Sequence, residues 1–192
     1  MKAIVKSVIA IGAFAGLAVA ASAQVANPRS LTLSKSSKLW IEGTSTVKSF
    51  TCTATRVDVD VLAEPGSPSA ELVSSAALTV PVASLECGNG TMNDHMRKAL
   101  KADRNPAISW KMASYKVDGT AVTMTGRLSI AGKENPIELR ATGTADPDGT
   151  VRIKGSTKFN MTQYGVKPPS LMLGTMKVGD PVTVSFDFVL TP

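Results

Sequence analysis

Apolar and polar residues alternate one for one through long stretches of this sequence, and this period of two is the feature that most constrains its fold. From Val122 to Ile130, apolar residues or glycine occupy every second position, and threonine, arginine and serine stand between them. The same alternation runs through residues 137–145, 151–159 and 182–190. Such a pattern places one set of side chains on each face of a β-strand. Because buried parallel strands are apolar without interruption, the alternation predicts antiparallel strands with one face in an apolar interior and the other in water.

Turn signals separate these runs. Asp118-Gly119 and the Asp-Pro-Asp-Gly sequence at 146–149 are typical of tight hairpin connections, and Gly132 and Pro136 bracket another turn. Further strands are predicted upstream, and one of them changes phase near Thr55, which predicts a β-bulge or bend there. These upstream strands, with a loop at 64–69 between the second and the third, are Leu33–Glu42, Val47–Leu62, Glu71–Val82 and Ala107–Val117.

Antiparallel strands joined by short connections predict an all-β fold. We expect an eight-stranded antiparallel up-and-down barrel with one short helix, because closure removes the exposed strand edges of an open sheet. A two-sheet sandwich is the alternative that the same strand pattern allows. The helix is expected from Thr91 to Lys101, with Thr91 or Asn93 as its N-cap, because glycine and proline are absent there and apolar residues recur at helical spacing. Residues 162–180 contain three glycines and two adjacent prolines, and a connection of this length is expected to be a functional loop or a lid.

The N-terminal segment has the pattern of a secretory signal peptide. Two lysines within the first six residues precede an apolar run at 8–20, and a small-residue Ala-Ser-Ala motif ends at Ala23. We therefore expect cleavage of residues 1–23, export to the periplasm or secretion beyond it, and a single β-barrel domain over residues 24–192. Since the next charged residue is Arg29, an uncleaved membrane anchor is the alternative.

Cys52 and Cys87 are the only cysteines of the chain. An exported protein can form a disulfide between them, and neither a C-x-x-C spacing nor neighbouring ligand residues indicate a redox or metal site. The sequence therefore predicts a structural disulfide, which would stabilise the fold by roughly 3–4 kcal/mol in the chain-entropy model.

The sequence lacks the motifs of common catalytic sites. It contains no G-x-S-x-G, no H-E-x-x-H and no glycine-rich phosphate loop, and His95 is its only histidine. We predict no catalytic residue, no metal site and no cofactor, so the chain is not expected to be an enzyme. The net charge of +6 is mild and aromatic residues make up only 5% of the chain, so nucleic-acid binding is not expected, whereas transient contact with an anionic membrane is.

The residues that the alternation turns inward are almost all apolar, so a ligand inside the barrel would be apolar, long and thin. An eight-stranded barrel can be filled by its own side chains or can hold one small ligand, and apolar alternation serves both. Small inward residues such as Gly126, Gly143 and Gly155 favour a cavity because they leave room. The inward residues predicted to contact a ligand are Trp110, Met112, Met124, Leu128, Phe159, Phe186 and Phe188.

Several motifs, each weak alone, occur in an order and spacing that resemble those of the YceI-like polyisoprenoid-binding family. The resemblance runs from about Leu31 to Leu190, and Lys48 stands where many members of the family have a histidine. The motifs are Leu-Trp-Ile-Glu-Gly-Thr-Ser at 39–45, Met-Asn-Asp-His-Met at 92–96, Gly-Arg-Leu-Ser-Ile at 126–130, Tyr-Gly-Val-Lys-Pro-Pro at 164–169 and Val-Gly-Asp-Pro-Val at 178–182.

The resemblance implies a lipocalin-like barrel that holds a long isoprenoid or a fatty lipid in its cavity. It places Tyr164, Pro168 and Pro169 in a loop near the cavity mouth, and Met92 and Met96 on a covering helix. It also implies a periplasmic location, a link to stress responses and, as in some members, a homodimer; no enzymatic activity is established for the family as a whole. Two functions therefore stay open. One is a periplasmic carrier of an isoprenoid or similar amphiphilic lipid, and the other is a non-enzymatic, stress-related structural or interaction module with a packed core.

Overall fold

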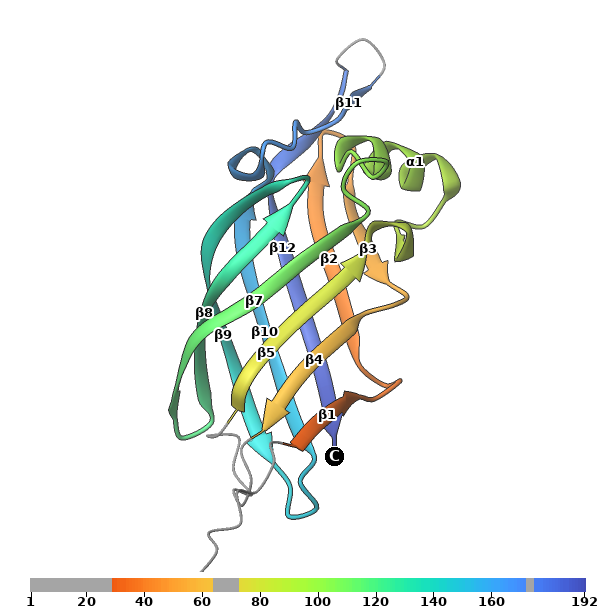
Figure 1. Ribbon diagram of the computed structural model, residues 1–192. Coiled ribbons are helices and arrows are strands. Elements are labelled where there is room, and N and C mark those ends of the chain that lie inside the picture. The colour runs from red at the N-terminus through yellow and green to blue at the C-terminus, as the bar shows by residue number, and fades with distance from the viewer. Residues whose placement is uncertain (1–28, 64–72, 172–174) are drawn as a thin grey trace, which may run out of the picture.

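The computed structural model describes residues 29–63, 73–171 and 175–192 of the chain. The predicted signal peptide at 1–23 and the predicted loop at 64–69 lie outside the described residues. The described strands form one antiparallel sheet wrapped into an elongated barrel. A helix and an irregular segment lie at one end of the barrel, and the C-terminus lies at the other (Figure 1).

Eight barrel strands form the wall, and each pairs with its neighbours along the chain in up-and-down order. The predicted eight-stranded antiparallel barrel is therefore confirmed, and the sandwich alternative is wrong. Each of the first three barrel strands is interrupted once, and an additional short segment, β11 (Ser170–Leu171), pairs with the beginning of the last strand. In chain order the barrel strands are β1 (Arg29–Leu33) with β2 (Lys38–Ser45), β3 (Ser49–Ala54) with β4 (Asp58–Ala63), β5 (Val73–Pro81) with β6 (Leu85–Glu86), β7 (Ala107–Asp118), β8 (Ala121–Ile130), β9 (Lys133–Ala145), β10 (Val151–Asn160) and β12 (Met176–Thr191).

The pairing of the first barrel strand with the last closes the barrel. In β1, Leu33 lies opposite Leu190 of β12, and β2 then continues along the same edge of β12. Between the two segments, the Ser37 hydroxyl donates a hydrogen bond to the Val189 carbonyl (3.3 Å) and accepts one from the Val189 N–H (3.0 Å). One serine side chain therefore takes the place of a ladder residue where the strand is interrupted.

The predicted change of phase near Thr55 is confirmed. Cys52 in β3 and Val61 in β4 are both buried and both line the interior. Their residue numbers differ by an odd number, so an uninterrupted strand would place them on opposite faces. The irregular residues between these segments are held by the neighbouring barrel strand. The N–H and the hydroxyl of Thr55 both donate to the Ser84 carbonyl (2.8 and 3.0 Å), and the Ser84 hydroxyl donates to the Arg56 carbonyl (3.0 Å).

The hairpins lie largely where the turn signals place them. Gly119 between β7 and β8 and Gly149 between β9 and β10 have positive φ angles of 58° and 86°. The turn between β8 and β9 is tighter than predicted, because Ala131 (φ 51°) and Gly132 (φ 81°) alone form it. Pro136 therefore lies inside β9 and not at the end of the turn. A two-residue turn with positive φ at both positions matches the twist of paired strands, which explains the short connection.

Helix α1 (Gly90–Ala99) lies across one end of the barrel (Figure 1). Its N-cap is Asn89, whose side-chain oxygen accepts a hydrogen bond from the Met92 N–H (3.0 Å). The prediction that Thr91 or Asn93 caps the helix is wrong, because an asparagine at position 89 already satisfies the first turn. The helix consequently begins one residue earlier than predicted, at a glycine.

The long stretch at 162–180 is only partly irregular. A 3-10 turn, η2 (Met161–Tyr164), stands at its beginning, but β12 already starts at Met176. In this early section of β12, Val178 lies opposite Ser45, and a register shift separates this pair from the regular pairing that begins at Val182. The sequence pattern missed it because the glycine and proline at 179–181 interrupt the alternation, and a sheet accommodates such residues at irregularities of this kind.

The small inward residues do not all leave room, as the sequence analysis expects them to. A Cβ atom at Gly126 would lie 2.6 Å from the Trp110 Nε1, and one at Gly155 would lie 2.8 Å from the Phe186 Cζ. Aromatic rings of neighbouring strands therefore already fill the space above these two glycines. Gly143 differs, because it lines the cavity and the side chain nearest to its Cβ position is 3.0 Å away.

Substitution of Gly126 or Gly155 by alanine should lower the free energy of unfolding. The added Cβ would lie 2.4 Å from the Lys111 carbonyl oxygen in the first case and 2.5 Å from the Arg140 carbonyl oxygen in the second, so backbone must move. We expect a loss of about 1–3 kcal/mol for each variant, the range of overpacked cores. Urea unfolding measures the loss of stability, and Gly143→Ala is the matched control that should lose less. Equal free energies of unfolding in the three variants would contradict the tight contacts at Gly126 and Gly155.

Candidate functional site

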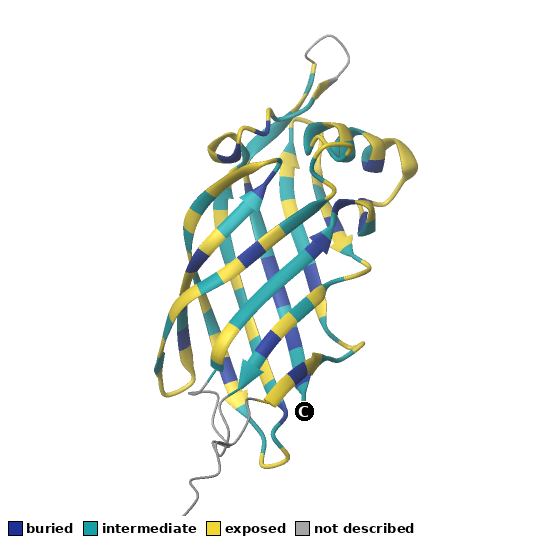
Figure 2. Cartoon of the chain, viewed as in Figure 1, coloured by how far each residue is buried: buried dark blue, intermediate teal, exposed yellow. Residues whose placement is uncertain are grey.

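The barrel interior is hollow. A cavity of about 840 Å³ is lined by side chains from every barrel strand and from α1. Inward apolar side chains such as Leu78, Met112 and Ile153 are only half-buried, and the largest fully buried side chains are Leu85 and Val82. Figure 2 shows this intermediate burial along much of the wall. Since a close-packed core would bury such side chains completely, the packed-core alternative does not fit the structure.

The residues predicted to contact a ligand lie in the wall of this cavity, with one exception. Pro168 does not line it; the neighbouring Pro169 does, and the Pro169 carbonyl accepts a hydrogen bond from the Val178 N–H at 3.0 Å. Residues 166–169 form an irregular segment without strand alternation, and the structure turns Val166 and Pro169 toward the cavity. The predicted residues that line the cavity are Met92, Met96, Trp110, Met112, Met124, Leu128, Phe159, Tyr164, Phe186 and Phe188.

The end of the cavity nearest the C-terminus is apolar. Leu31, Val61 and Leu190 form a buried cluster where β1, β4 and the end of β12 meet (Figure 1). Val61 and Leu190 are also part of the cavity wall, together with the half-buried Val151. A ligand that reaches this end would meet hydrocarbon surface, which favours the apolar end of an amphiphile.

The cavity opens at the opposite end, between a turn and the helix. Val47 and Lys48, in the turn between β2 and β3, line the cavity and are exposed to solvent. Asn89 and Thr91, at the N-terminal end of α1, share both properties. Val47 is 66% exposed, a high value for a valine. These residues define what we call the mouth of the cavity, and sequence reasoning missed Val47, Asn89 and Thr91 because a turn and a helix cap carry no alternation.

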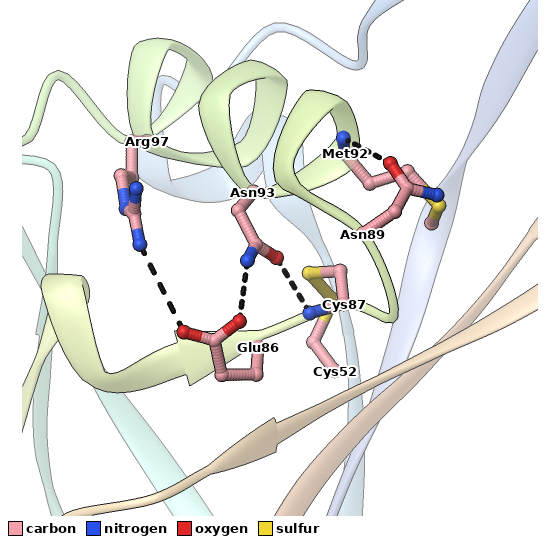
Figure 3. Close-up of a disulfide and its surroundings, with 7 residues drawn as sticks. All are labelled: Cys52, Glu86, Cys87, Asn89, Met92, Asn93 and Arg97. Atoms are coloured by element: carbon pink, nitrogen blue, oxygen red, sulfur yellow. Dashed lines mark hydrogen bonds and ion pairs between the residues drawn. A yellow bond between two sulfur atoms is a disulfide. The ribbon is translucent and has the colours of Figure 1, made fainter.

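The predicted disulfide between Cys52 and Cys87 is present, and it joins the two sides of the mouth (Figure 3). Cys52 lies in β3, shortly after the turn that carries Lys48, and Cys87 lies shortly before the N-cap of α1. Both cysteines line the cavity and are 4% and 5% exposed, respectively. The crosslink therefore fixes the beginning of the covering helix to the barrel wall.

A buried asparagine attaches the helix at a second point. The Cys87 N–H donates a hydrogen bond to the Asn93 Oδ1 (2.7 Å), and the Asn93 Nδ2 donates to the Glu86 carboxylate (Figure 3). Arg97, one helical turn further on, forms an ion pair with Glu86 at 4.0 Å. Asn93 is thus a docking residue of the helix and not its cap, a role for which the sequence offers no local signal.

Tyr164 closes another part of the wall at this end of the barrel. It is 3% exposed and its ring meets the Phe159 ring edge to face at 5.2 Å. Burial raises the pKa of the Tyr164 phenol above its usual value, because desolvation disfavours the charged phenolate. Its place between Ile130, Val166 and Phe159 makes it a packing residue of the cavity wall.

The chemistry of the cavity is almost entirely apolar. Among the described residues that form its wall there is no carboxylate, and the basic side chains are Lys48 and His95. The same part of the chain contains no group of three or more histidine, cysteine, aspartate or glutamate side chains placed to hold a metal ion. Across the described ranges, no helix is long and apolar enough to cross a membrane.

The family model for the YceI-like domain matches residues 28–190, which span the barrel from β1 to all but the last residue of β12. The chain belongs to the YceI-like domain family. The resemblance stated from the sequence motifs is thereby confirmed.

Solved structures share the fold of this YceI-like domain. BcnA of Burkholderia cenocepacia superposes with a TM-score of 0.68 at 21% identity, covering 80% of this chain and 95% of BcnA. A polyisoprenoid binding domain from Saccharophagus degradans, implicated in plant cell wall breakdown, superposes with a TM-score of 0.62 at 14% identity, covering 84% and 97%. Three Pseudomonas aeruginosa proteins called UPF0312 protein are each 25% identical over 108 residues, which is 53% of this chain. The chain thus spans about half the length of these curated relatives (55%).

Loss of the Cys52–Cys87 disulfide should lower the free energy of unfolding and loosen α1. The crosslink closes a loop of 35 residues, worth about 4 kcal/mol in the chain-entropy model. Urea unfolding of the oxidised protein, the reduced protein and a Cys52→Ser/Cys87→Ser variant measures the loss. Hydrogen exchange should rise in α1 and stay slow in the β8–β9 hairpin; uniform protection in all three samples would contradict a role in fixing the helix.

Proposed function

We propose that this YceI-like domain is a periplasmic binding protein that carries a long isoprenoid or similar amphiphilic lipid in its barrel cavity. The observation that carries the proposal is the apolar cavity of about 840 Å³, open at one end and apolar at the other. The fold shared with the Saccharophagus degradans polyisoprenoid binding domain supports the same ligand class. Burial of a hydrocarbon chain would supply most of the binding free energy, at about 25 cal/mol per Å² of apolar surface.

The cavity volume bounds the size of the ligand. At roughly 30 Å³ per non-hydrogen atom, the share of a water molecule in the liquid, 840 Å³ holds about 28 atoms. That number corresponds to about five or six isoprene units of five carbon atoms each. A longer chain would extend through the mouth into solvent or to a partner surface.

Binding, and not catalysis, is the activity that the cavity composition supports. General acid–base chemistry needs a proton donor and an acceptor close to the reacting atoms. The basic side chains of the described cavity wall are Lys48, at the mouth, and His95, on α1, and apolar side chains surround the space where the ligand chain would lie.

The periplasmic location and the partners remain predictions of the sequence. A disulfide that crosslinks the mouth is consistent with an oxidising compartment such as the periplasm. Transient membrane contact, which a carrier needs in order to load and unload lipid, and a homodimer belong to the same proposal.

Mass spectrometry of an organic extract tests the function directly. Protein purified from its native host without detergent should release a stoichiometric polyprenyl or fatty species. A clean extract that stays clean after challenge with octaprenyl and fatty ligands would overturn the proposal.

A side chain placed in the cavity should block ligand uptake without unfolding the barrel. Ala76 lines the cavity opposite Val61, so Ala76→Phe adds a ring to the ligand space. We expect affinity for farnesol, measured by displacement of the neutral probe N-phenyl-1-naphthylamine, to fall by about tenfold or more. Ser75→Phe, at the adjacent exposed position, is the matched control that should bind normally. Equal affinity in two folded variants would contradict the assignment of the cavity as the ligand site.

Export should leave a shortened protein. If residues 1–23 form a cleaved signal peptide, the intact mass of protein from the periplasmic fraction should correspond to a chain that begins at Gln24. A full-length chain in the membrane fraction would instead establish the uncleaved anchor.

A further inference from the structure

The polar side chains at the mouth of the cavity can all donate hydrogen bonds. Lys48 carries an ammonium group, and the Thr91 hydroxyl can donate. The Asn89 side-chain oxygen accepts a hydrogen bond from the Met92 N–H, and the Asn89 amide nitrogen can donate to a ligand (Figure 3). A mouth of this composition favours a ligand group that is rich in acceptor oxygens.

The positive charge of Lys48 is not neutralised by a neighbouring carboxylate. None of the ion pairs among the described residues includes Lys48. The carboxylates near the beginning of the helix, Glu86 and Asp94, pair with Arg97 at 4.0 and 3.6 Å and do not line the cavity. Lys48 is therefore the exposed, unpaired cation of a cavity wall that holds no carboxylate among the described residues.

The backbone that carries Lys48 is held in place by its own turn. The Ser45 hydroxyl donates to the Lys48 carbonyl (2.8 Å) and accepts from the N–H groups of Val47 (3.2 Å) and Lys48 (3.1 Å). The next residue, Thr46, donates its N–H to the Lys177 carbonyl of β12 (3.0 Å). The backbone of this turn therefore needs little reorganisation when Lys48 binds an anion, and the entropic cost of the contact is that of ordering the side chain.

We propose that Lys48 is the head-group site of this protein, and that it selects single-chain lipids whose polar end is an anionic phosphate or carboxylate. The inference rests on the proposed function, since the lipid chain must lie in the cavity for its head group to reach the mouth. The donors of Asn89 and Thr91 complete the site, because an anionic oxygen accepts hydrogen bonds from neutral donors as well as from the ammonium group. Val47, beside Lys48, would contact the first carbon atoms of the chain.

A series of probes with one chain and different heads tests the site. Hexadecyl phosphate, hexadecanoate, hexadecanol and hexadecyltrimethylammonium are each titrated against N-phenyl-1-naphthylamine bound to the full protein. Lys48→Met should weaken both anions by about three- to fivefold, the range of a solvent-exposed ion pair, and leave hexadecanol unchanged. Lys48→Glu should weaken them further, and Lys48→Arg should restore binding. Added salt should weaken the anions only.

Lys177 provides the matched control, because it is an exposed lysine hydrogen-bonded to the same turn but is not part of the cavity wall. Lys177→Met should leave all four affinities unchanged. Equal losses in Lys48→Met and Lys177→Met, or equal losses for hexadecanol and hexadecyl phosphate, would overturn the head-group site while leaving lipid binding intact. Failure of every probe to bind the unaltered protein would overturn the proposed function itself, and the head-group site with it.

Discussion

A closed ladder of backbone hydrogen bonds joins the strands of this domain around an interior that its own side chains do not fill. The eight barrel strands pair in sequence, and the contact of β1 and β2 with β12 leaves the two ends of the sheet joined. Where the ladder is interrupted, the side chains of Ser37 and Thr55 supply the missing hydrogen bonds. Closure therefore stabilises a wall that surrounds about 840 Å³ of space.

Aromatic rings and a disulfide stiffen this hollow wall at particular points. The rings of Trp110 and Phe186 lie over Gly126 and Gly155, so part of the interior surface is covered from within the wall itself. The Cys52–Cys87 disulfide stiffens the mouth, where α1 is also attached through the Asn93 hydrogen bonds and through the packing of Met96 against the core. The rigid parts of the domain are therefore the barrel wall and the attachment of α1 at the mouth, and the centre of the barrel stays open.

The sequence predicts this fold well wherever a residue's role follows from its face of a strand. The alternation of 122–130 and its neighbours yields the barrel, and the change of parity at Thr55 is readable because both sides of it are apolar. The turn at Ala131 and Gly132 is predicted too long, because an alanine with positive φ has no residue signature. Its tightness depends on the pairing of two strands and not on local composition.

The candidate site follows the same division. Its inward strand residues are predicted from strand phase, whereas Pro168 is placed by the family resemblance alone, and the neighbouring Pro169 lines the cavity instead. The room expected above Gly126 is absent because it depends on the rotamer of Trp110 on the next strand, which a sequence pattern does not encode. Lys48 enters the wall through a turn whose shape comes from the Ser45 hydroxyl.

The hollow interior makes ligand binding and folding parts of one equilibrium. The half-buried side chains that would contact a lipid are the same side chains that form the hydrophobic core, so a bound chain completes a core that the polypeptide leaves open. Any molecule that binds the folded state alone raises the free energy of unfolding, by about 2.7 kcal/mol at one hundred times its dissociation constant. Under the proposed function, the supply of lipid in the surroundings would therefore set the fraction of this protein that is unfolded and open to proteolysis.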